Sequence, residues 1–129
     1  MIITAINETI RNGWVVGTAA SETQPGSQGF LWCPTGGPTT CQGATIALPR
    51  AAEANKVNST LLIVGRERTA AAYGPLAMWR GDRYLGRLPV PAGHLGSAGA
   101  LAEDGTVLGW VSPTSDPSNG GQPAVWTMG

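Results

Sequence analysis

Three of the five tryptophans in this sequence of 129 residues are evenly spaced. Trp32, Trp79 and Trp126 are separated by 47 residues in each interval, and each ends a short apolar segment. Upstream of each tryptophan, a glycine follows a pair of apolar residues; these glycines are Gly17, Gly65 and Gly109. The distance from one of these glycines to the next varies only by the length of a loop. Because insertions in repeat proteins collect in the connections, the pattern predicts one unit repeated three times, with these tryptophans and glycines as its structural core.

The segments around these residues predict strands. They are short, and the 19 glycines, 10 prolines and 12% charged residues suit many short strands joined by tight turns. We expect an all-β fold, a single domain of three four-stranded antiparallel repeats over residues 1–49, 50–97 and 98–129. The predicted strands are 1–5, 14–19, 29–32, 44–48, 61–68, 76–79, 83–88, 98–102, 106–111 and 123–126. Residues 50–56 are predicted to form a strand and a turn, with a short helix as the alternative that their alanines suggest. Residues 7–13 and His94 are assigned to turns or loops, and the third repeat is expected to lack its fourth strand.

Units of this size that form four strands are typical of β-propeller blades. Two stretches also carry a family resemblance: Ile6-Asn7 with Val15-Val16-Gly17 and Phe30-Leu31-Trp32, and Leu85-Gly86-Arg87-Leu88-Pro89 leading into Val107-Leu108-Gly109. They look like the HAF-type repeats of bacterial extracellular proteins. The resemblance implies propeller blades, usually in larger arrays, and no catalytic residues. The family's Asn-Asp-Ser-Gly turn is matched most closely by Glu103-Asp104-Gly105.

The number of repeats bears on how such a fold is completed. Three blades do not close a ring, because propellers use roughly four to eight. We expect two half-propellers to close as a homodimer, with Met1 to Ile3 of one copy supplying the absent strand of the other. The alternative is a β-trefoil or β-prism, in which three four-stranded repeats close within a single chain of this size.

The functional expectation is a non-catalytic binding or assembly module. Rigid β scaffolds commonly present binding loops, and the incomplete ring favours a component of a virion or other surface particle, with copies of itself or other particle proteins as partners. The alternative is a lectin-like protein whose aromatic side chains stack on a glycan. Its candidate ligand-binding residues are Trp14, Tyr73, Tyr84 and Trp110, for which packing in a core or interface is the competing interpretation.

Patterns for catalysis and cofactor binding are missing from the sequence. His94 is the only histidine, the acidic residues are scattered, and no glycine-rich loop is followed by a phosphate-binding lysine. We therefore expect no enzyme activity and no cofactor. A hydrolase would need a concave pocket that holds at least two convergent acids.

Charge and hydropathy narrow the classes of partner. Eight basic and eight acidic side chains cancel, so we expect no nucleic-acid partner. No apolar run approaches the roughly 20 residues that span a bilayer. Residues 1–13 contain no basic region followed by a long apolar core, so we expect no secretory signal and a cytoplasmic or virion-associated location.

Cys33 and Cys41 lie at the two ends of a seven-residue segment that follows the first repeat tryptophan. If this segment is a hairpin loop, a disulfide between them would close its base and contribute about 2 to 3 kcal/mol. The alternative is a pair of free thiols in a reducing compartment. Two cysteines and a distant histidine are too few for a zinc site, so we expect no metal.

Overall fold

The computed structural model describes residues 2–9, 13–20, 26–34, 43–70, 74–115 and 121–127. Sheet 1 contains β1 (Ile2–Thr9), β2 (Val15–Ala20), β3 (Ser27–Trp32) and β4 (Thr45–Ala47). Sheet 2 contains β5 (Ala51–Val57), β6 (Leu62–Glu67), β7 (Leu76–Arg80) and β8 (Arg83–Arg87). Sheet 3 contains β9 (His94–Leu101), β10 (Val107–Pro113) and β11 (Gln122–Trp126). The described residues form no helix, and the predicted all-β, antiparallel class is confirmed.

The strands follow the predicted order, and the described part of the third repeat has three of them. The bounds of two strands differ from the prediction by four residues, and the others differ by at most two. β1 continues to Thr9, because its polar residues reach sheet 2: Asn7 Nδ2 donates to Ala54 O at 2.8 Å, and a Glu8 carboxylate oxygen accepts from the Val57 N–H at 2.8 Å. β9 begins at His94 instead of a loop, because its pairing with β10 extends to Pro113.

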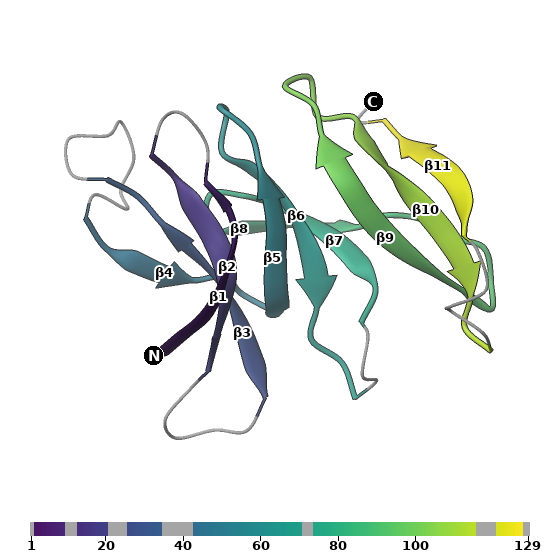
Figure 1. Cartoon of the computed structure of the whole chain (residues 1–129), viewed down its shortest axis with the longest axis horizontal. Coiled ribbons are helices and arrows are strands. Elements are labelled where there is room, and N and C mark those ends of the chain that lie inside the picture. The colour runs from purple at the N-terminus through teal and green to yellow at the C-terminus, as the bar shows by residue number, and fades with distance from the viewer. Residues whose placement is uncertain are drawn as a thin grey trace.

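The three sheets lie side by side in a row, with sheet 2 in the middle (Figure 1). One apolar cluster lies between sheets 1 and 2 and includes Val16, Leu31, Ile63 and Trp79. A second lies between sheets 2 and 3 and includes Val64, Met78, Val107 and Trp126. Sheet 2 is therefore buried on both faces, which explains the continuous apolar run of β6. The two apolar clusters are separate, and each lies between one pair of neighbouring sheets.

The repeat glycines lie where two backbones approach closely. Gly65 pairs with Ala54, and the register between β5 and β6 shifts on both sides of this pair. A Cβ on Gly65 would collide with the carbonyl oxygen of Glu53 and lie 2.9 Å from Ala54 Cα. In the same way, a Cβ added to Gly17 would collide with Ala5 O, and a Cβ added to Gly109 would collide with Ser97 O. A β-bulge that brings a carbonyl into the sheet face thus requires glycine at each position.

Two of the repeat tryptophans join one unit to the next by the same hydrogen bond. Trp79 Nε1 donates to Pro49 O at 2.8 Å, and Trp126 Nε1 donates to Pro89 O at 2.7 Å. Both prolines follow the leucine at the end of the preceding unit. Each indole therefore fills the space between two sheets and satisfies its N–H there, as a buried tryptophan requires.

Asn58 makes a further connection between units 2 and 3. Its side chain is buried, and Oδ1 accepts hydrogen bonds from the Thr60 and Leu62 N–H groups at 3.1 Å each. Its Nδ2 donates to Ala102 O at 3.0 Å, in the corresponding turn of sheet 3. The amide thus fixes its own turn and links it to the neighbouring one. In this turn Leu61 takes a left-handed backbone with φ of 63°, which glycine would adopt more readily.

Candidate functional site

The outer face of sheet 3 exposes apolar side chains that are buried in the equivalent positions of sheet 2. Counting from the repeat glycine and tryptophan, Leu108 and Val125 correspond to Val64 and Met78. The two side chains in sheet 2 pack toward sheet 3 and are at most 2% exposed, whereas Leu108 is 47% and Val125 61% exposed. We define the trailing face as Leu108, Trp110, Pro123 and Val125.

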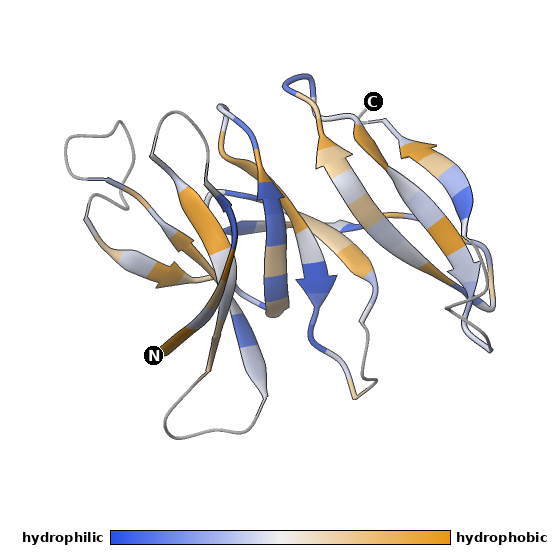
Figure 2. Cartoon of the chain, viewed as in Figure 1, coloured by the Kyte–Doolittle hydropathy of each residue, from blue (hydrophilic) through white to orange (hydrophobic). Residues whose placement is uncertain are grey.

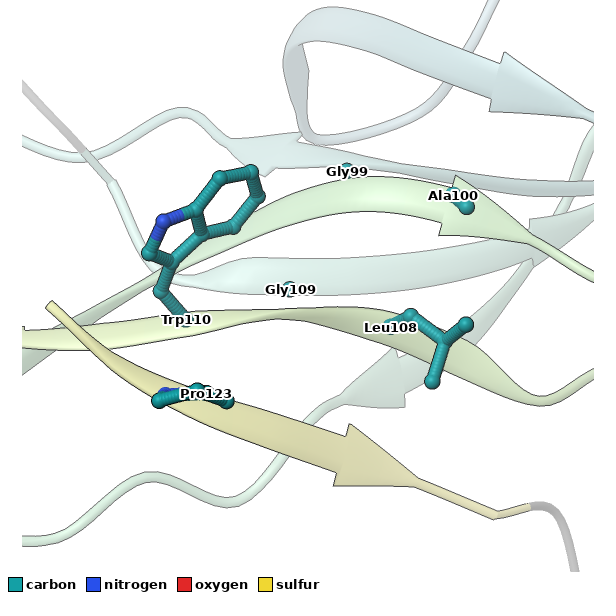
Figure 3. Close-up of a pocket in the computed structure, with 6 residues that line it drawn as sticks. All are labelled: Gly99, Ala100, Leu108, Gly109, Trp110 and Pro123. Carbon is teal, nitrogen blue, oxygen red and sulfur yellow. The ribbon is translucent and has the colours of Figure 1, made fainter.

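Trp110 borders a shallow pocket in this face. The pocket has a volume of about 360 Å³ and is lined by Gly99, Ala100, Leu108, Gly109, Trp110 and Pro123. Figure 3 shows the indole lying over β9 beside Gly99, with Pro123 on the neighbouring strand β11. Gly99 allows this contact, because a Cβ there would lie 2.6 Å from the indole ring. Trp110 is nevertheless 47% exposed. The pocket is apolar, and none of its lining residues has a charged or amide side chain.

The opposite end of the row also carries apolar side chains on the side that faces away from sheet 2. Leu31 packs toward sheet 2, so the next residue of β3, Trp32, points to the other side. In β1, Ile3 pairs with Ala19 and Ile6 with Gly17, and these isoleucines are 47% and 64% exposed. We define the leading face as Ile3, Ile6, Val15 and Trp32. Their equivalents in sheet 2 are all buried against sheet 1; they are Ala51, Ala54, Ile63 and Trp79.

Both ends of the row therefore present apolar surface. Figure 2 shows hydrophobic segments at the start of β1 and along β10 and β11. All eight residues that define the two faces are apolar. Their chemistry suits contact with another apolar surface.

The aromatic residues predicted to bind a ligand lie in different environments in the structure. Trp14 is 4% exposed and belongs to the core between sheets 1 and 2, because its side chain alternates with Val15 and so faces sheet 2. Tyr84 is half-buried, and its hydroxyl donates to Glu67 Oε2 at 2.9 Å. Tyr73 lies outside the described residues. Trp110 alone of the described three offers a broad exposed ring.

The structural tryptophans also differ among themselves. Trp79 and Trp126 are buried between sheets, whereas Trp32 is half-buried on the leading face. None of the described residues accepts a hydrogen bond from Trp32 of the kind that Pro49 and Pro89 accept from its equivalents. A sequence repeat gives no signal for this difference, because it depends on whether a neighbouring sheet is present.

A polar cluster around Glu67 lies beside the core of sheet 2. Arg87 Nε donates a hydrogen bond to Glu67 Oε2 at 2.8 Å. This bond, together with the one from the Tyr84 hydroxyl, holds the pKa of the Glu67 carboxyl below its ordinary value. Desolvation by burial opposes this shift. Tyr84 also packs against Trp79 in a T-shaped arrangement, with ring centroids 5.8 Å apart, and Arg50 lies 4.8 Å from the centre of the Tyr84 ring. The cluster therefore orders β6, β7 and β8 around a charged carboxylate.

Glu67 and Glu53 both line a cavity of about 220 Å³ between sheets 1 and 2. Glu53 forms an ion pair with Arg66, with Oε1 and Nε 3.4 Å apart. Each of these acids is thus paired with an arginine. A glycosidase of the usual kind needs one carboxyl whose pKa is raised so that it donates a proton, and Glu67 has the opposite shift.

The structure describes one of the two cysteines and several of the side chains that could bind a metal ion. Cys33 is buried and disulfide-bonded, but Cys41 lies outside the described residues, so the pairing of the two stays a prediction. Asp, Glu, His and Cys side chains of the described residues form no group of three that suits a metal ion. His94 is exposed, and its Nδ1 lies 3.1 Å from Ala92 O.

No protein-family model, curated protein or solved structure matches this chain. The resemblance to HAF-type repeats therefore stays a prediction that depends on the sequence motifs. Among the described residues there is no helix with the length and hydrophobicity to cross a membrane.

Proposed function

We propose that this chain is a non-catalytic assembly module, a row of three β-propeller-like blades that associates through the sheet faces at its ends. Each sheet is a four-stranded or three-stranded antiparallel meander, and neighbouring sheets pack face to face, as blades do in a propeller. Copies of the chain, or other proteins of a larger particle, are the partners that such a module binds.

One observation carries this proposal. The positions that are buried inside the row, such as Met78 and Ala54, have equivalents at its ends that are apolar and exposed, such as Val125 and Ile6. Contiguous apolar surface on a soluble protein marks an interaction site more often than isolated apolar residues do. The faces at the ends of the row thus repeat an interface that the chain already makes twice.

Sedimentation equilibrium over a range of protein concentrations tests the proposal. We expect a mass of at least twice the 13.2 kDa of one chain, with dissociation on dilution. A single species of 13.2 kDa at every concentration would contradict an assembly role based on copies of this chain.

Carbohydrate binding is the second candidate, and its supporting observation is the exposed indole of Trp110 beside the shallow pocket. Aromatic rings stack on the apolar faces of sugars, but the pocket lacks the polar side chains that usually fix a ligand's orientation. A glycan array with wild type and Trp110→Ala tests this function. Binding that the substitution abolishes would favour it, and the absence of any hit would exclude it.

A further inference from the structure

We infer that the trailing face of one copy binds the leading face of a second copy, so that the copies associate head to tail. This inference rests on the assembly role proposed above and specifies its two surfaces and their orientation. The occupant of the trailing face is therefore a second copy of this chain.

The packing of sheet 2 on sheet 3 provides the template for this contact. Val64 and Met78 of sheet 2 pack on a surface that includes Val107 and Trp126 of sheet 3. Leu108 and Val125 repeat the first side of this contact, since they occupy the positions of Val64 and Met78 one unit later. The trailing face of sheet 3 thus corresponds to the face of sheet 2 that sheet 3 covers. Among the described residues, no further sheet covers the trailing face.

The leading face repeats the other half of the same interface. Val15 and Trp32 occupy the positions that Val107 and Trp126 hold in sheet 3, and that Ile63 and Trp79 hold in sheet 2. A tryptophan and a β-branched residue therefore recur in all three units at the positions that receive the preceding sheet. Among the described residues, the equivalents of the trailing face in sheets 1 and 2 pack on the equivalents of the leading face in the sheet that follows. A contact between two trailing faces has no such precedent.

The hydrogen bonding of the tryptophans agrees with this assignment. Trp79 and Trp126 each donate their indole N–H to the unit that precedes them. Trp32 occupies the same position in sheet 1, half-buried and without that bond among the described residues. A copy that docks on the leading face takes the place of the preceding unit and covers this indole.

The contact is heterologous, because the two faces are different. A heterologous contact produces a closed ring when its rotation closes and an open filament when it does not. A ring of two copies would hold six sheets, which lies within the range of roughly four to eight blades of known propellers. β1 bears on how such a ring is built: Ile2 and Ile3 pair with Ala20 and Ala19 of their own sheet, and β1 lies at the edge of that sheet.

The test uses one aspartate on each face and a matched control. Ile6→Asp changes the leading face, Leu108→Asp changes the trailing face, and Leu85→Asp changes a side chain that is 40% exposed on β8, outside both faces. All three sites are exposed in the single chain, so circular dichroism is expected to show wild-type folding. Sedimentation then measures association of each variant alone and of the first two mixed.

We expect Ile6→Asp and Leu108→Asp each to weaken association at least about 100-fold, because a contact would bury an unpaired charge. Leu85→Asp is expected to associate like wild type. An equimolar mixture of the two face variants is expected to recover a dimer of twice 13.2 kDa, since each copy keeps one intact face and the two intact faces are complementary.

Three outcomes separate this inference from the proposed function. If wild type associates and Ile6→Asp associates equally well, the head-to-tail orientation is refuted while an assembly role stands. If both face variants dissociate but their mixture does not recover a dimer, the complementarity of the two faces is refuted. A monomeric wild type would instead refute the assembly role itself. Ile3→Asp and Val125→Asp form a second pair if either first variant fails to fold.

Discussion

Replacing Gly65 by alanine tests the packing that defines the repeat. An alanine in place of a strand glycine ordinarily stabilises a protein by about 0.4–1 kcal/mol, because it reduces the entropy of the unfolded chain. Here the added Cβ would lie 2.9 Å from Ala54 Cα and collide with Glu53 O. Carbon atoms in contact prefer a separation of about 3.5–4.0 Å. The crowding atoms belong to the backbone of β5, so they cannot move aside as a side chain does.

We therefore expect Gly65→Ala to cost at least about 3 kcal/mol, the upper end of the usual cost of overpacking. Gly96→Ala is the matched control, because its Cβ would meet the flexible Leu76 side chain at 3.1 Å. We expect that variant to stay within about 1 kcal/mol of wild type. Urea denaturation followed by far-UV circular dichroism measures both. If the two variants lose stability equally, the close approach of β5 to Gly65 is refuted.

The remaining predictions concern the core, a buried amide and pH. Trp79→Ala is expected to cost about 3–5 kcal/mol by urea denaturation, and Trp79→Phe less, since it loses the bond to Pro49 O but keeps a buried ring; equal losses would argue against a contribution of the ring's packing. Asn58→Ala is expected to cost about 3 kcal/mol, because it leaves buried backbone groups unpaired, and a change below about 0.5 kcal/mol would contradict this. The pKa of Glu67 is lowered by the Arg87 hydrogen bond, so its contribution to stability is present above the ordinary carboxyl pKa of about 4.5 and is lost as pH falls through the lower folded value. Melting temperatures at acid pH should therefore fall less steeply for Glu67→Gln than for wild type, and parallel curves would refute the assignment.

The location of the strands could be predicted because it depends on local signals. Short apolar segments, turn residues and the tryptophan spacing indicated the units, and the antiparallel order of β6, β7 and β8 follows from short connections. The end of β1 was missed for a different reason. Asn7 and Glu8 are polar, so they looked like turn residues, but they continue the strand because sheet 2 supplies their hydrogen-bond partners.

The sequence by itself determined that this chain is built from a repeated β unit, because periodic spacing and strand patterning are written into neighbouring residues. It did not determine which copy of a repeated side chain is buried. Trp79 and Trp32 occupy the same position in their units, yet only Trp79 lies between two sheets. Trp14 and Trp110 looked alike as binding candidates, and one is in the core while the other is exposed. Only the tertiary structure decided these cases, because burial depends on whether a neighbouring sheet covers the face on which a side chain lies.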